Sequence, residues 1–250
     1  YFFPVNTAMT ERFTQYIPHE NAMCAFGKQL INAICRLPSQ QNVTLYLNGD
    51  LGAGKTTLLY LMSGLLRPDE GQVTFNDINV RLRKPSTTAD IFIVPDEYEL
   101  PRVSLSEYIR VNSVFYPRFS HDDLRRYLDV FGMTEDTHLG NLSLGQGKKV
   151  FMSFAMATHT RVLLMDEPTN GLDIPGKAQF RKFLTEGRTP ESIFVVSTHQ
   201  VKDIEQVLDH IVMFDNSKIL ANADMQSIFP DGKIDLERYF NERINQQTAE

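Results

Sequence analysis

The chain has 250 residues, 42% of them hydrophobic and 22% charged, a balance typical of globular proteins that argues against disordered and fibrous classes. Its 25 Lys and Arg residues face 31 Asp and Glu residues, and the net charge of −6 disfavours general affinity for nucleic acid. No apolar run approaches the roughly 20 residues that cross a bilayer, so we expect no direct membrane span. Two cysteines, Cys24 and Cys35, are too few for a disulfide framework, which favours a reducing cytosol.

The first part of the chain contains a glycine-rich loop between a predicted strand and a predicted helix. Residues 13–17 are strand-like, and apolar residues at three- and four-residue steps predict a helix over 20–36. A β-rich run at 43–47 leads into the glycine-rich stretch 49–56, and a helix is predicted over 57–66. A strand, a glycine loop and a helix in this order are typical of a phosphate-binding loop.

Beyond the loop, short apolar runs alternate with predicted helices. The predicted strands are 72–75, 89–94, 162–165 and 192–197, with a hairpin formed by 211–214 and 218–220. The predicted helices are 105–131 with an interruption at Pro117, 142–158, 177–184 and 201–208. This alternation predicts an α/β fold whose mainly parallel sheet is covered by helices on both faces.

The glycine loop predicts a nucleotide site. Gly52 and Gly54 let the backbone curl so that successive N–H groups face phosphate oxygens, and the following helix adds its positive N-terminal end. Lys55 is expected to reach the β- and γ-phosphates, and the Thr56 hydroxyl is expected to ligate Mg²⁺. The residues expected to bind the nucleotide here are Gly49, Asp50, Leu51, Gly52, Ala53, Gly54, Lys55, Thr56 and Thr57.

Two carboxylates follow the predicted strand 162–165, at the sheet edge where open α/β sheets bind ligands. Asp166 is expected to hold the magnesium, directly or through water. Glu167 is expected to polarise the attacking water as general base. Together with the glycine loop, these acids predict phosphoryl transfer.

Further motifs resemble those of the ATP-binding cassette (ABC) ATPases. Residues 49–56 resemble the Walker A loop and 163–166 the Walker B strand, with Glu167 matching the catalytic glutamate. Residues 142–146, Leu-Ser-Leu-Gly-Gln, resemble the LSGGQ signature with Leu144 in place of its first glycine. The remaining matches are Gly171 to Asp173 with the D-loop and His199 with the switch histidine.

The resemblance implies a P-loop NTPase fold with a helical subdomain at about 100–157, and it implies ATP hydrolysis with Mg²⁺. It adds Ser143, Gly145, Gln146 and Asp173 to the nucleotide-binding residues and His199 and Lys55 to the catalytic ones. In the family, the signature contacts ATP bound by a second subunit, which implies a homo- or heterodimer. It further implies a separate transmembrane subunit, and hence a cytoplasmic protein peripheral to the inner face of the membrane.

One position departs from the family pattern. Asp96 stands after the strand 89–94, where the family usually has the glutamine of the Q-loop. Two interpretations stay open: its carboxylate approaches Mg²⁺ or water, or Asp96 begins a turn.

The front of the chain resembles a different family. Residues 9–57 are similar to TsaE, the small bacterial P-loop ATPase of tRNA threonylcarbamoyladenosine synthesis, with a helix where cassettes usually carry an antiparallel β region. Phe13 or Tyr16 then either stacks on adenine or packs in the first strand. This resemblance suggests two parental sequences joined at the phosphate loop, with alternative functions in tRNA modification or as an inactive nucleotide binder. The expected organisation is an extension or tag at 1–8, the TsaE-like segment 9–57, a cassette-like remainder 58–240 and a polar tail 241–250.

Overall fold

The computed structural model describes residues 43–48, 54–68, 72–189, 191–215 and 218–248, and the statements below concern these residues. The strand expected at 13–17, the helix expected at 20–36 and the loop residues Gly49 to Ala53 lie outside them. The TsaE-like segment is therefore described only at its end, from Val43 to Asn48 and from Gly54 onward.

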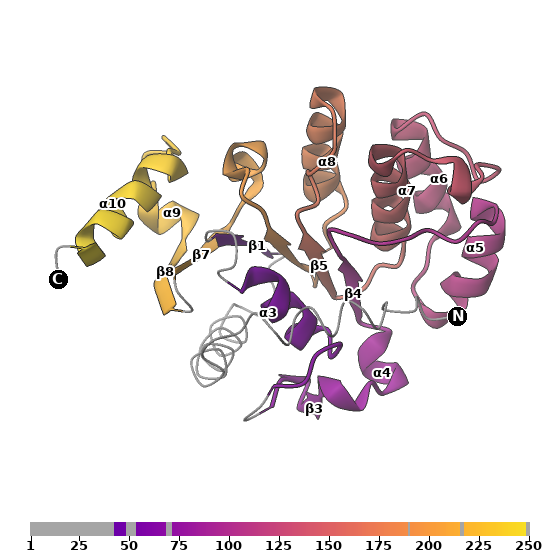
Figure 1. Ribbon diagram of the computed structural model, residues 1–250, viewed down its shortest axis with the longest axis horizontal. Helices are drawn as coiled ribbons and strands as arrows, with labels where there is room; N and C mark the ends of the chain where they lie inside the picture. The colour runs from indigo at the N-terminus through magenta and orange to yellow at the C-terminus, as the bar shows by residue number, and fades with distance from the viewer. Residues whose placement is uncertain (1–42, 49–53, 69–71, 190, 216–217, 249–250) are drawn as a thin grey trace.

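Six of the described strands form one sheet in the order β4-β5-β6-β1-β7-β8 (Figure 1). Every neighbouring pair is parallel except β7 and β8, which are antiparallel. The mainly parallel sheet and the C-terminal hairpin are thus confirmed. The strands are β1 (Val43–Asn48), β4 (Ile91–Val94), β5 (Val162–Asp166), β6 (Ile193–Ser197), β7 (His210–Asp215) and β8 (Lys218–Asp224).

A second, two-stranded sheet pairs β2 (Thr74–Phe75) with β3 (Ile78–Asn79), so the strand predicted at 72–75 is shorter than expected. The described helices are α3 (Lys55–Met62), α4 (Pro85–Thr88), α5 (Leu105–Asn112), α6 (His121–Val130), α7 (Leu144–Ala157), α8 (Ile174–Glu186), α9 (Met225–Ile228) and α10 (Leu236–Thr248). The short 3₁₀ turns are η1 (Val80–Leu82), η2 (Ser113–Phe115), η3 (Leu139–Asn141), η4 (Val201–Asp203) and η5 (Glu205–Val207).

Alternate residues of the central strands enter two separate hydrophobic cores. Leu164 and Val195 pack with Leu58 and Leu59 of α3 on one face of the sheet. On the other face, Leu163 belongs to a larger core that includes residues of α5, α6, α7, α8 and α10. Figure 1 shows α3 on the side of the sheet opposite α7 and α8. Because both faces are buried, the strands read as continuous apolar runs, as parallel sheets require.

The helical part between β4 and β5 contains α5, α6 and α7, which fall within the helical subdomain expected at about 100–157. The interruption expected at Pro117 is wider than one residue, since α5 ends at Asn112 and α6 begins at His121. Ser104 and Ser120 cap the two helices, each accepting a backbone N–H three residues on.

The prediction of a helix over 201–208 is wrong. The structure has two 3₁₀ turns there, η4 and η5, separated at Ile204 by a φ of −133°. Val201, Ile204 and Leu208 are buried, so the apolar spacing correctly marks residues that face the core. Apolar spacing marks which side chains are buried, and the two 3₁₀ turns bury these three side chains without an α-helix.

Several boundaries also differ from expectation. Helix α3 covers Lys55–Met62 and not 57–66, and α8 extends beyond the predicted 177–184 at both ends. Helix α10 was not predicted, and it continues to Thr248 through most of the polar tail 241–250. Within the described residues, no helix combines the length and the apolar character needed to cross a membrane.

Candidate active site

The first two residues of α3 bring an ammonium and a hydroxyl to the carboxyl edge of the sheet. The preceding Gly54 has a φ of 91°, a left-handed conformation that glycine adopts without strain. This conformation turns the chain directly into α3, where Lys55 is mostly buried and Thr56 follows it. The helix packs through Leu58 and Leu59 against the sheet, which fixes the position of its N-terminus.

Asp166, the last residue of β5, lies against Thr56. The Thr56 Oγ1 donates to Asp166 Oδ2 over 2.6 Å, and the Ser197 hydroxyl at the end of β6 donates to Asp166 Oδ1. Only 2% of Asp166 is exposed. Burial raises the pKa of Asp166, the nearby Glu167 and Asp96 carboxylates raise it further, and the two hydroxyl donors oppose the rise.

Glu167 follows Asp166 and meets Lys55 and His199. Its Oε1 lies 3.9 Å from the Lys55 Nζ, and its Oε2 lies 3.0 Å from His199 Nδ1. The backbone N–H of His199 also donates to Oε2, over 3.2 Å. Lys55 from α3 and His199 from the end of β6 therefore converge on the Glu167 carboxylate at the end of β5, as the parallel order of these strands allows.

The backbone of Glu167 is strained. Its φ of 44° lies in the left-handed region, which costs a non-glycine residue about 1–3 kcal/mol and persists only where the surroundings hold it. Its N–H donates to the Ser197 carbonyl over 2.7 Å, continuing the β5–β6 pairing one residue past the strand. The turn aims the side chain back toward His199, with the contacts described above.

Asp96 is held by a lysine that the sequence analysis did not select. The Asp96 Oδ1 accepts from Lys148 Nζ over 2.9 Å and from Asn170 Nδ2 over 3.3 Å. Lys148 lies in α7, is 1% exposed, and also donates to the backbone carbonyls of Glu167 and Asn170. The acid in place of the family's neutral glutamine was a signal that a base would lie nearby, but it did not indicate which base.

The predicted signature residues begin α7. The Ser143 Oγ accepts from the Gln146 N–H, and the Gln146 side chain accepts from the Ser143 N–H, which together form a capping box. Gly145 lies against the carbonyl of Gly171, because a Cβ at position 145 would come within 2.8 Å of that oxygen. Leu144, at the position of the signature's first glycine, is 65% exposed.

Asp173 caps α8 beside this group. Its Oδ1 accepts from the Gly176 N–H over 3.0 Å and from Lys149 Nζ over 3.2 Å. The Lys149 ammonium lowers the pKa of Asp173, and the Gly176 amide adds to that effect. The predicted residues that the structure describes therefore form two main groups: one around Asp166 and Glu167, and one in which Gly145 lies against Gly171 and Lys149 pairs with Asp173.

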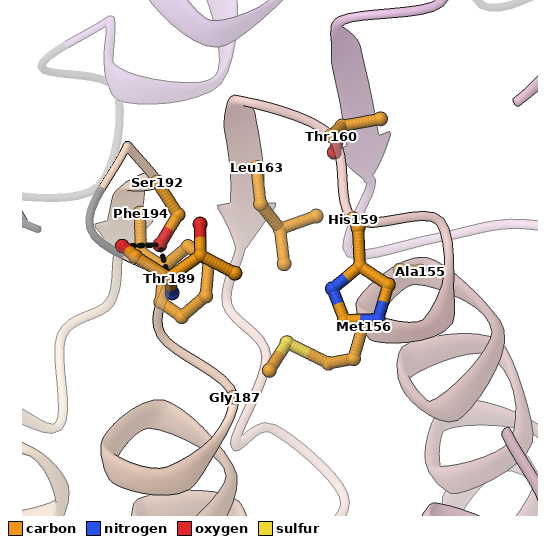
Figure 2. Close-up of a pocket in the computed structure, with 9 residues that line it drawn as sticks. All are labelled: Ala155, Met156, His159, Thr160, Leu163, Gly187, Thr189, Ser192 and Phe194. Carbon is orange, nitrogen blue, oxygen red and sulfur yellow. Dashed lines mark hydrogen bonds between the residues drawn. The ribbon is translucent and has the colours of Figure 1, made fainter. Parts of the chain in front are cut away.

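The hollow in Figure 2 belongs to neither group. It lies near the amino ends of β5 and β6, whereas Asp166 and Ser197 end those strands on the opposite edge of the sheet. Within it, Thr189 and Ser192 exchange two hydrogen bonds of 2.9 Å that close a turn before β6. The lining residues are Ala155, Met156, His159, Thr160, Leu163, Gly187, Thr189, Ser192 and Phe194.

Comparison with known proteins connects this geometry with one family. The family described as ABC transporter matches residues 35–170, more than half of the chain. A molybdenum import ATP-binding protein, ModC of Photobacterium profundum, is 30% identical over 206 residues. That match covers 77% of this chain but only 55% of the relative. The energy-coupling factor transporter ATP-binding protein EcfA2 of Mycoplasma genitalium is 26% identical, over 83% of this chain and 75% of the relative.

Solved structures agree with the fold. A structure of the ATP-binding subunit of an ABC transporter has a TM-score of 0.70 at 21% identity, covering 81% of this chain and 88% of its own. The family match begins at residue 35, so it includes the last part of the segment that sequence analysis likened to TsaE. The comparisons give no support to that resemblance or to an origin from two parental sequences, and a role in tRNA modification is not favoured.

Proposed function

This chain belongs to the ABC transporter family, and on that premise we propose that it binds and hydrolyses ATP as the nucleotide-binding subunit of a transporter. The observation that carries the proposal is the convergence of Lys55, Thr56, Asp166, Glu167 and His199 at one edge of the sheet. Ligands of open α/β sheets bind at the carboxyl ends of the strands, where these residues lie.

Each of these residues has a chemical task in the proposed reaction. Lys55 and the N-terminus of α3 would bind the β- and γ-phosphates, whose negative charge the ammonium and the helix dipole both favour. Glu167 would orient a water molecule for in-line attack on the γ-phosphorus and accept its proton. His199 would contact the γ-phosphate oxygens from the neighbouring strand end. The products are ADP and inorganic phosphate.

The donor set around Asp166 fits Mg²⁺. Thr56 supplies a hydroxyl oxygen 2.6 Å from the Asp166 carboxylate, and hard oxygen donors of this kind, completed by water and phosphate, are what Mg²⁺ prefers. Asp166 is buried with its pKa raised by burial and by nearby carboxylates, so a cation beside it would relieve an unfavourable charge. When bound, Mg²⁺ would neutralise charge on the phosphate oxygens, while Thr56 and Asp166 would hold it in place.

The second group of residues points to a composite site. Ser143, Gly145, Gln146 and Asp173 would contact ATP bound by a second ATPase subunit, either another copy of this chain or a related one. The chain would work with a separate transmembrane subunit at the cytoplasmic side of a membrane. The name of ModC specifies molybdenum import, whereas that of EcfA2 specifies no cargo, so no cargo is assigned to this chain.

Replacement of Glu167 by Gln tests the proposed role of the base. The amide keeps the size of the side chain but cannot accept the proton, so the rate of ATP hydrolysis should fall about 10²- to 10⁴-fold. The affinity for ATP should stay close to that of the wild type, and an ATP-dependent dimer should accumulate in sedimentation experiments. Glu186→Gln is the matched control, because Glu186 is exposed on α8 and forms its ion pair with Lys182, outside the proposed site.

Separate measurements of binding and turnover distinguish the possible results. An unchanged hydrolysis rate in Glu167→Gln would remove Glu167 from the mechanism. Wild-type protein that binds ATP without hydrolysing it would instead indicate an inactive nucleotide binder.

A further inference from the structure

The buried ammonium of Lys148 contacts three segments around the proposed active site. It donates to Asp96 Oδ1 after β4 over 2.9 Å, to the Glu167 carbonyl after β5 over 2.8 Å, and to the Asn170 carbonyl over 3.1 Å. An ammonium has three N–H donors, and three acceptors therefore satisfy it fully. Lys148 belongs to α7, so the signature helix is tied directly to the turn that carries Glu167.

Packing alone does not explain this lysine. The side chain is 1% exposed, and an ammonium removed from water costs several kcal/mol unless it is paired and hydrogen-bonded. A Met or Leu would fill the same space without that cost. The neighbouring Lys149 keeps more of its side chain in water, so burial is specific to position 148.

The contact with Glu167 falls on the residue whose backbone is strained. The N–H of Glu167 is held by the Ser197 carbonyl, and its carbonyl is held by Lys148 and by the Asn170 N–H. Hydrogen bonds to the peptide groups on both sides of Glu167 thus hold its left-handed φ of 44°. The same φ sets where the side chain leaves the strand end and hence where its carboxylate meets Lys55 and His199.

We propose that Lys148 is a positioning residue for Glu167: its ammonium, neutralised by Asp96, holds the Glu167 backbone so that the carboxylate is aligned for the reacting water. Asp96 then acts as the counterion of Lys148. The inference rests on the proposed ATPase function, because it assigns Lys148 a role through the base of that reaction. Misplacing a catalytic group by about 1 Å can cost 10²-fold in rate.

Four variants test the proposal. Lys148→Met should lower kcat by about 100-fold, the size expected of a misplaced group, while KM for ATP changes less than threefold. Asp96→Asn leaves the ammonium on the two carbonyls, so kcat should fall much less. Asp96→Asn with Lys148→Met removes both charges. Removing both members of an ion pair whose cation is buried is often neutral for stability, so the double variant should regain thermal stability but keep the low kcat.

Lys182→Met is the control, because Lys182 forms an exposed pair with Glu186 on α8 and should leave turnover unchanged. A second readout needs no nucleotide: amide hydrogen exchange of Asn170, whose N–H donates to the Glu167 carbonyl over 3.1 Å. Both Lys148→Met variants should accelerate that exchange by at least tenfold at the same temperature and pH. Lys182→Met should not alter it.

Several results would overturn the proposal. Recovery of kcat together with stability in the double variant would show that Lys148 serves folding alone. Asp96→Asn with a kcat as low as Lys148→Met, and an increased Mg²⁺ requirement, would instead make Asp96 the functional group. A wild-type protein without ATPase activity would refute the proposed function, and the exchange of Asn170 would still decide whether Lys148 holds the turn.

Discussion

Gly64 follows the helix that carries Lys55 and Thr56 and lies against the backbone of Val80, and its replacement by Ala should destabilise the protein. Gly64 has a φ of +73°, directly after α3, and a Cβ there would lie 2.5 Å from the Val80 carbonyl oxygen and 2.9 Å from its carbon. Real Cβ atoms essentially never approach that closely. The Val80 backbone is held in turn, since its N–H donates to Val73 and its carbonyl accepts from Arg83.

Two costs add up in Gly64→Ala. An L-residue in the left-handed region costs about 1–2 kcal/mol. Forcing a methyl group into a close-packed contact costs about 1–3 kcal/mol. The reduced freedom of the unfolded chain returns about 0.4–1 kcal/mol. The net loss in the free energy of unfolding should therefore be about 1–4.6 kcal/mol, centred near 3 kcal/mol.

Gly232→Ala is the matched control for this experiment. Gly232 has the same φ of +73°, but a Cβ there would meet nothing within 4 Å. It should therefore lose only the conformational part, about 1 kcal/mol. Urea denaturation of both variants gives the comparison, provided that the dependence on denaturant is unchanged. Equal losses in the two variants would refute the reasoning, because the contact with Val80 would then contribute nothing.

Two further changes have defined outcomes. Because burial raises the pKa of Asp166, its ionised form destabilises the fold: this penalty is absent below the unfolded pKa of about 4, grows as pH rises toward the folded pKa, and is constant above it. Without Mg²⁺ or ATP, Asp166→Asn should therefore gain stability relative to wild type as pH rises from 4 to 8, measured by denaturation; a pH-independent difference would contradict this. Ser143→Ala removes the capping box, so the free energy of unfolding should fall by about 1 kcal/mol and ATP hydrolysis should be lost. Ser120→Ala, which uncaps α6, should lose similar stability but keep turnover, and equal ATPase losses would argue against a role for Ser143 beyond capping.

The sheet was predictable because its strands are buried on both faces. Residues 162–165 and 192–197 are nearly uninterrupted apolar runs, and alternate side chains enter separate cores. The order in which the strands pair depends on contacts between residues far apart in the sequence. The sequence therefore predicted a mainly parallel sheet but not its strand order. The helix expected at 201–208 failed for a related reason. Its apolar spacing marks buried residues, but a 3₁₀ turn and an α-helix bury such a short stretch equally well.

The proposed active site was predictable where its residues follow strands. Asp166, Glu167 and His199 come directly after apolar runs, so their meeting at one edge follows from parallel pairing. Lys148 could not be selected in the same way, because 52 residues separate it from Asp96 and nothing local distinguishes it from Lys149. This ion pair, in which only the lysine is buried, depends on how α7 packs beside β4, which no short pattern encodes.

The link between Lys55 and Glu167 has a consequence for the order of events. In the proposed reaction the same ammonium serves two anions in turn, first a protein carboxylate and then a triphosphate. An incoming triphosphate carries several negative charges, whereas the Glu167 carboxylate carries one, so the nucleotide would bind the Lys55 ammonium in its place. Glu167 Oε1 would then be able to accept a hydrogen bond from water. The base would thus be restrained while the protein is idle and released by the substrate itself.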